Sequence, residues 1–135
     1  MAAFAIGTVC GVLNEYVQKP HQPCYQRPEY SHFLTCGACN VYGWSVVALT
    51  GYFDLMTRLR VPPAILLLAV SPILTVLEAA MGVISQWYFK EQRWCYPASY
   101  YPACGGTVSL VSGVYFAVAG VLYWYVLYKP LISKL

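Results

Sequence analysis

Four apolar stretches separated by short polar segments dominate the sequence. The third and fourth run from Val61 to Phe89 and from Thr107 to Tyr128, and each reaches the roughly 20 residues that a membrane-spanning helix needs. The second runs from about Val41 to Met56 and reaches that length if residues 38–40 join it. The first, Ala2 to Val17, becomes polar at its end and is the shortest of the four. Because backbone in hydrocarbon must satisfy its own hydrogen bonds, we expect each stretch to be helical.

The pattern therefore predicts an all-α integral membrane protein, a bundle of four transmembrane helices forming a single domain over residues 1–135. We expect spans at about 2–18, 38–56, 62–89 and 107–128, and two cysteine-bearing outer loops at about 19–37 and 90–106. Pro62 and Pro63 suit the first turn of the third helix. Pro72 lies inside that helix and is expected to kink it.

Aromatic residues gather where the fourth stretch ends: Tyr123, Trp124, Tyr125 and Tyr128. Rings at such positions commonly anchor helix ends at headgroup depth. Packing between helices is the alternative for some of them, and the sequence leaves both interpretations open.

Composition agrees with a membrane protein and excludes several other classes. Hydrophobic residues make up 59% of the chain and charged residues 10%, whereas a soluble domain carries roughly 25% charged residues. The net charge of +3 is dispersed, and no Lys/Arg run could follow a phosphate backbone, so we expect no nucleic-acid partner. The sequence has no P-loop and no metalloprotease or serine-hydrolase motif. The lipid bilayer is the first partner to expect.

Basic residues and cysteines predict the orientation. Arg58 and Arg60 lie in the shortest loop, and Lys129 and Lys134 lie in the C-terminal tail. The positive-inside rule acts most strongly on short segments, so both termini are predicted in the cytoplasm. The two longer loops then face the extracellular or lumenal side of a plasma membrane or secretory-pathway membrane.

Five cysteines fall on the predicted outer side: Cys24, Cys36, Cys39, Cys95 and Cys104. Disulfides persist in that environment. The connectivity does not follow from the sequence. A pair within the first loop together with Cys95–Cys104 is the simplest arrangement, and the odd number leaves at least one cysteine for another role.

Cys36-Gly37-Ala38-Cys39 forms a CxxC where the first loop enters the second span, a spacing that favours a reducible disulfide. In topology and cysteine placement the chain resembles the bacterial periplasmic membrane thiol oxidases, which are also four-helix proteins. That resemblance implies electron transfer from a partner's thiols through two cysteine pairs to a quinone. It does not extend to the sequence beyond the CxxC, and the short first span departs from it. The alternative is that the two cysteine pairs form structural disulfides that hold the loops in place.

A zinc site is a weaker hypothesis. The first loop carries zinc-type ligands within 19 residues, namely His21, Cys24, His32, Cys36 and Cys39. No closed four-ligand spacing is present, and an oxidising compartment favours disulfides. We therefore expect no metal and no cofactor.

Glu78 is the ionisable residue deepest in a long span, near the middle of Val61 to Phe89. A lone charge there costs about 3 kcal/mol. Glu78 could serve a proton or cation pathway, dock another subunit, or be a neutral acid bonded to Ser or Thr of a neighbouring helix. On the fourth helix, a stripe of small residues, Gly113, Ala117 and Gly120, favours close packing by another helix of the same bundle over a partner contact.

The hypothesis that best fits these features is a non-catalytic accessory, assembly or stabilising subunit of a larger membrane protein complex. Its partners would be other membrane subunits. A thiol–disulfide oxidoreductase using Cys36 and Cys39 is the second hypothesis. A small proton or ion channel or transporter around Glu78 is the third.

Overall fold

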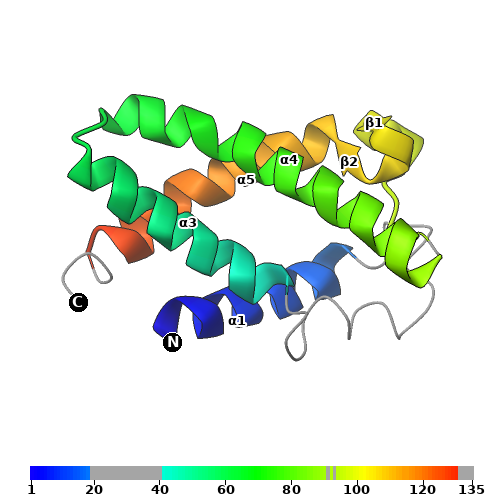
Figure 1. Ribbon diagram of the computed structural model, residues 1–135, viewed down its shortest axis with the longest axis horizontal. Helices are drawn as coiled ribbons and strands as arrows, with labels where there is room; N and C mark the ends of the chain where they lie inside the picture. The colour runs from blue at the N-terminus through cyan, green and yellow to red at the C-terminus, as the bar shows by residue number, and fades with distance from the viewer. Residues whose placement is uncertain (19–40, 91, 93, 131–135) are drawn as a thin grey trace.

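The computed structural model describes residues 1–18, 41–90, 92 and 94–130. Its α-helices are α1 (Ala2–Gln18), α3 (Val41–Arg58), α4 (Pro63–Phe89) and α5 (Leu110–Leu122), and α5 continues into the π-helix η6 (Tyr123–Tyr128) (Figure 1). The segment after α4 holds two short 3-10 turns, η4 (Ala98–Tyr100) and η5 (Cys104–Gly106). The strands β1 (Pro102–Ala103) and β2 (Val108–Ser109) pair antiparallel there. The prediction of a mostly helical chain is confirmed.

The helices contact one another mainly as two pairs, α1 with α3 and α4 with α5. Figure 1 shows α3 and α4 diverging from their connecting turn, with α1 beside the start of α3 and α5 crossing behind α4. The first pair is close because glycines lie in its interface. A Cβ at Gly7 would lie 2.5 Å from the Tyr42 carbonyl oxygen, one at Gly11 would overlap the Tyr42 ring, and one at Gly43 would lie 2.7 Å from Phe4.

An aromatic cluster joins α3 to the second pair. Phe53 is completely buried and packs edge-on against Trp124 and Tyr128, at centroid distances of 4.9 and 5.3 Å. Tyr123 is buried on the same cluster, and its hydroxyl lies 2.7 Å from Thr50 Oγ1. These three η6 rings therefore pack between helices, whereas Tyr125 is exposed.

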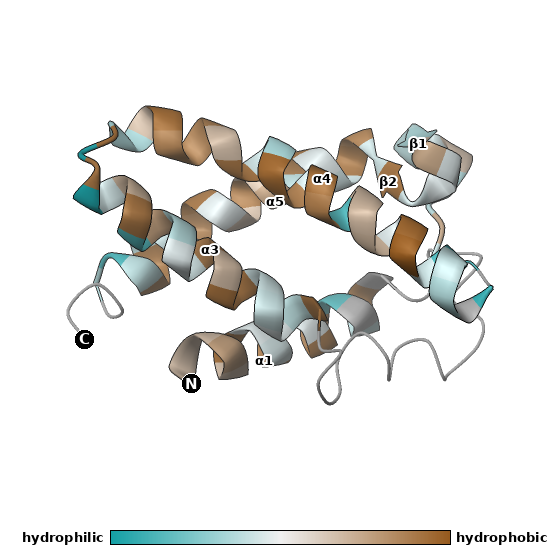
Figure 2. Cartoon of the chain, viewed as in Figure 1, coloured by the Kyte–Doolittle hydropathy of each residue, from teal (hydrophilic) through white to brown (hydrophobic). Residues whose placement is uncertain are grey.

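The exposed side chains of α4 and α5 are mostly apolar, and Figure 2 shows hydrophobic residues along both helices. Exposed side chains there include Leu68, Val76, Val114 and Val118. Within the described residues, two segments are long and apolar enough to cross a membrane: Pro63–Tyr88, with 26 residues, and Leu110–Tyr128, with 19. The apolar part of α1, Ala2–Asn14, is shorter. These lengths do not test the predicted four crossings.

One local detail differs from the expected spans. The fourth helix begins at Leu110 rather than at residue 107, because Ser109 caps it: the Ser109 side chain accepts the Ser112 N–H, and the Ser112 side chain accepts the Ser109 N–H. The third helix continues through Pro72 as one α-helix, and the expected kink there stays a prediction.

Candidate functional site around Glu78

Glu78 lies beside the first turn of α5, although it is central in the sequence of α4. The Ser112 hydroxyl, in that first turn, lies 3.1 Å from Oε2 of Glu78. Unsatisfied backbone N–H groups give a helix N-terminus a partial positive charge, which favours a nearby carboxylate. The antiparallel packing of α4 and α5 thus gives this acid a polar environment that a count of residues along α4 does not reveal.

A second donor comes from the segment after α4. The hydroxyl of Tyr96 donates to Oε1 of Glu78 at 2.5 Å. The Tyr96 N–H donates to the Gly106 carbonyl at 2.9 Å, and its ring stacks on Tyr100 with centroids 6.0 Å apart. The position of Tyr96 is therefore determined by the folding of its own loop.

The loop lies directly on α4 because residue 82 is a glycine. A Cβ at Gly82 would lie 2.6 Å from Cβ of Thr107, which is 2% exposed. The indole N–H of buried Trp94 donates to the Thr107 carbonyl at 2.8 Å and fixes the same part of the loop. Gly82 is one turn from Glu78, so this contact holds the loop where Tyr96 reaches the acid.

The Ser112 hydroxyl lets the site accept either protonation state of Glu78. Its oxygen accepts the Ser109 N–H at 3.0 Å and also lies 2.9 Å from the Ser109 carbonyl. Its one hydrogen can point to that carbonyl or to Glu78, but not fully to both. Rotation toward Glu78 suits a carboxylate, whereas rotation toward Ser109 lets a protonated Glu78 donate to Ser112.

The predicted cysteine pairing Cys95–Cys104 is wrong. Cys104 is a free, exposed thiol at a positive φ of 50°, whereas Cys95 is disulfide-bonded. Gly105 and Gly106, which follow Cys104 in η5, also have positive φ.

The remaining predicted ligands, Cys24, Cys36, Cys39, His21 and His32, lie outside the described residues. Within the described part of the chain, no three His, Cys, Asp or Glu side chains group as metal ligands would.

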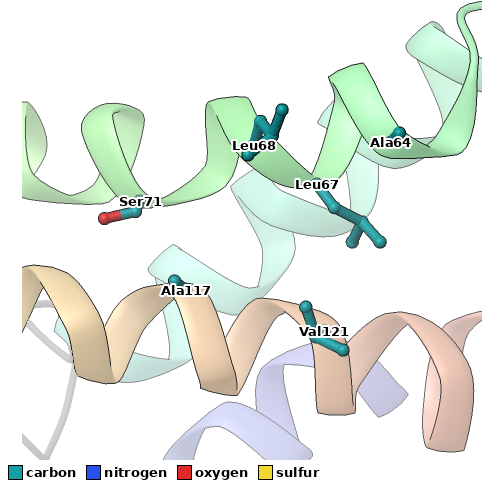
Figure 3. Close-up of a pocket in the computed structure, with 6 residues that line it drawn as sticks. All are labelled: Ala64, Leu67, Leu68, Ser71, Ala117 and Val121. Carbon is teal, nitrogen blue, oxygen red and sulfur yellow. The ribbon is translucent and has the colours of Figure 1, made fainter.

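The small-residue stripe on α5 faces α4 of the same chain. A Cβ at Gly120 would lie 2.6 Å from Val70 Cγ1, and Ser71 donates to the Gly113 carbonyl at 2.6 Å. Ala117 borders an apolar cleft of about 480 Å³ between the two helices (Figure 3). Its lining consists of Ala64, Leu67, Leu68, Ser71, Ala117 and Val121.

Sequence reasoning missed two features of this architecture. Gly7 and Gly11 form a Gly-x3-Gly pattern, the usual signal of a close helix contact in membranes, and would have predicted the α1–α3 interface. No sequence pattern marks Tyr96 as a partner of Glu78, because the two residues are 18 positions apart and meet only once the loop has folded.

The sequence matches a known protein family. Residues 2–135 match the family described as "Putative ABC-transporter type IV". No curated protein and no solved structure matches the chain. The family indicates a membrane-associated, transporter-related protein, and the lengths of the two apolar helices α4 and α5–η6 agree with membrane association. Since the match covers nearly the whole sequence, the chain belongs to this family.

Proposed function

We propose that this chain is a non-catalytic membrane subunit of a transporter complex, with an accessory, assembly or stabilising role. ABC transport requires ATP hydrolysis, and these 135 residues contain no P-loop. Another polypeptide or domain would therefore supply the nucleotide-binding site. Family membership supports the transporter context.

The observation that carries a stabilising role is the internal hydrogen bonding of Glu78. Both carboxyl oxygens meet hydroxyl groups of the same chain, from Tyr96 and from Ser112. An acid that transfers protons through a membrane needs access to water from both sides. Here the close contact of Gly82 with Thr107 packs the loop onto α4 one turn from the acid. Glu78 therefore links two helices and a loop.

The proposal includes a four-span topology with both termini in the cytoplasm and the 90–106 loop outside. The Tyr128 hydroxyl donates to Asp54 at 2.5 Å, so the end of η6 and the α3–α4 turn lie at one end of the molecule. Arg58, Arg60 and Lys129 are exposed at this end, as the positive-inside rule expects for the cytoplasmic side. Residues 94–106 of the loop lie at the opposite end (Figure 1).

Proton-coupled transport is a second candidate, and the Ser112 hydroxyl is the observation that favours it. A hydroxyl that serves either protonation state would let Glu78 gain or lose a proton without leaving its position. The oxidoreductase hypothesis is less favoured, because the expected second pair does not form: Cys104 is a free thiol.

The test is to purify the full chain from its native membrane in mild detergent, measure its native mass and identify the proteins that co-purify. A subunit role predicts a complex containing an ATP-hydrolysing protein. The purified chain alone should carry no protons when reconstituted in vesicles with a pH-sensitive dye. Proton flux that Glu78→Gln abolishes would reject the subunit role and establish the second candidate.

A further inference from the structure

The cleft between α4 and α5 presents a hydrocarbon surface. Five of its six lining residues are apolar, and Figure 3 shows Leu67 of α4 pointing toward α5, with Ala117 and Val121 on the side of α5 that faces α4. Ser71 is the polar exception, and its hydroxyl donates to the Gly113 carbonyl at 2.6 Å. The lining therefore offers no free side-chain hydrogen-bond donor, and an occupant would be held mainly by apolar contact.

One end of the cleft is positively charged. Arg60 lies in the α3–α4 turn, four residues before Ala64, and Tyr125 lies four residues after Val121. The Lys129 Nζ lies 5.9 Å from the centre of the exposed Tyr125 ring, so this cation is held beside the same end. The nearby acid Asp54 already accepts the Tyr128 hydroxyl. Basic side chains next to an apolar cleft match an anionic headgroup joined to a hydrocarbon chain.

We infer that this cleft binds one acyl chain of an anionic glycerophospholipid, whose phosphate lies between Arg60 and Lys129. The apolar lining and the position of the charges at a helix end both fit a lipid, in which a charged group lies at headgroup depth and the chain extends into the bilayer. A transmembrane helix of a partner would fill the cleft equally well, but it would give the two cations no counter-charge.

Native mass spectrometry of the full detergent-solubilised chain tests this inference. The chain is titrated with phosphatidylglycerol and, separately, with phosphatidylcholine carrying the same acyl chains. We expect one phosphatidylglycerol to be retained per protein, in preference to phosphatidylcholine. A basic side chain near an anionic lipid is worth about fivefold in affinity, so Arg60→Gln and Lys129→Gln should each reduce the preference by about that factor.

Matched variants separate the cleft from the rest of the surface. Lys90 also lies over an aromatic ring, 5.8 Å from the centre of Trp87, but at the other end of α4. Lys90→Gln should therefore leave the preference unchanged. Ala117→Leu fills the cleft and should lower retention of both lipids severalfold. Ala80→Leu adds the same volume at an exposed position of α4 away from the cleft and should lower neither.

Three results would overturn the inference. The first is equal retention of the two lipids by the unmodified chain. The second is a preference that survives both Arg60→Gln and Lys129→Gln; their side chains are exposed, so these variants decide the question even if Ala117→Leu does not fold. The third is a dimer that carries no lipid and that Ala117→Leu dissociates, because a second copy would then occupy the cleft.

Discussion

The hydroxyl of Tyr96 lies 2.5 Å from Oε1 of Glu78, 18 residues away in the sequence. This bond fastens the loop after α4 to the middle of that helix, next to the capped start of α5. The stability of the loop, the register of the two helices and the polar environment of the acid are therefore coupled.

Tyr96→Phe is expected to destabilise the protein by about 1–3 kcal/mol, because it leaves one oxygen of a half-buried carboxyl without its donor. Thermal unfolding in detergent, followed by circular dichroism, measures the effect. Tyr101→Phe removes a hydroxyl from an exposed ring of the same loop and should leave the midpoint unchanged. Equal midpoints for the two variants would contradict a stabilising role for the Tyr96–Glu78 bond.

Replacing Glu78 itself separates hydrogen bonding from ionisation. Glu78→Gln keeps an acceptor of similar size and should fold and assemble nearly normally. Glu78→Leu leaves the Tyr96 hydroxyl without an acceptor and should cost about 1–3 kcal/mol. Thermal midpoints and co-purification of partner subunits are measured for both. A Gln variant as unstable as the Leu variant would show that the charge, rather than the hydrogen bonds, is what the fold needs.

Gly7→Ala should separate α1 from α3, since its methyl group would lie 2.5 Å from a backbone oxygen that cannot move alone. The expected loss is about 1–3 kcal/mol, together with faster proteolysis of the N-terminal helix. Gly51→Ala is the matched control, because nothing lies within 4 Å of its added Cβ. The control should be neutral or slightly stabilising. Similar proteolysis of both variants would refute a close α1–α3 interface.

Phe53→Ala should be among the most damaging single changes, with a loss of about 3–5 kcal/mol. Phe53 is fully buried, and its removal opens a cavity among Trp124, Tyr123 and Tyr128. Leu55→Ala, at a half-exposed position two residues along the same helix, should cost much less. Denaturation midpoints in detergent compare the two, and a larger effect at Leu55 would place the core elsewhere.

Cys104 should react with an impermeant maleimide in intact cells without prior reduction, because its thiol is free and exposed and the four-span topology puts it outside. Peptide mass analysis should find Cys95 modified only after reduction. Cys104→Ser is the control for labelling at this site. Labelling of Cys104 only after the cells are permeabilised would reverse the proposed orientation.

Much of the helical pattern was predictable from the sequence because apolar run length decides where helices form in a membrane protein. The expected span at 62–89 and α4 at Pro63–Phe89 differ by one residue. The start of α5 was misjudged by three residues, because Thr107 and Val108 are apolar enough to extend the run. The start of α5 is instead set by a local hydrogen-bonded cap at Ser109.

The environment of Glu78 was less predictable, because it depends on how far one helix slides along another. Hydropathy puts Glu78 at the centre of its own helix. The pairing of Gly120 with Val70 and of Gly113 with Ser71 sets the register that brings α5 to begin beside it. Side-chain volumes at these contacts decide that register, and the sequence of one helix alone does not show which residues of the other helix it will contact.

The unequal lengths of α4 and α5–η6 have a consequence for the surrounding bilayer. At 1.5 Å per residue, the 19 residues of Leu110–Tyr128 extend about 28 Å, close to the roughly 30 Å of a typical hydrocarbon core, whereas the 26 residues of Pro63–Tyr88 extend about 39 Å. A bilayer matched to the shorter segment makes the longer one tilt or project, and leaves Glu78 near the headgroups. A thicker bilayer would cover both segments and draw the acid into hydrocarbon, so membrane thickness itself would act on the Tyr96–Glu78–Ser112 contact.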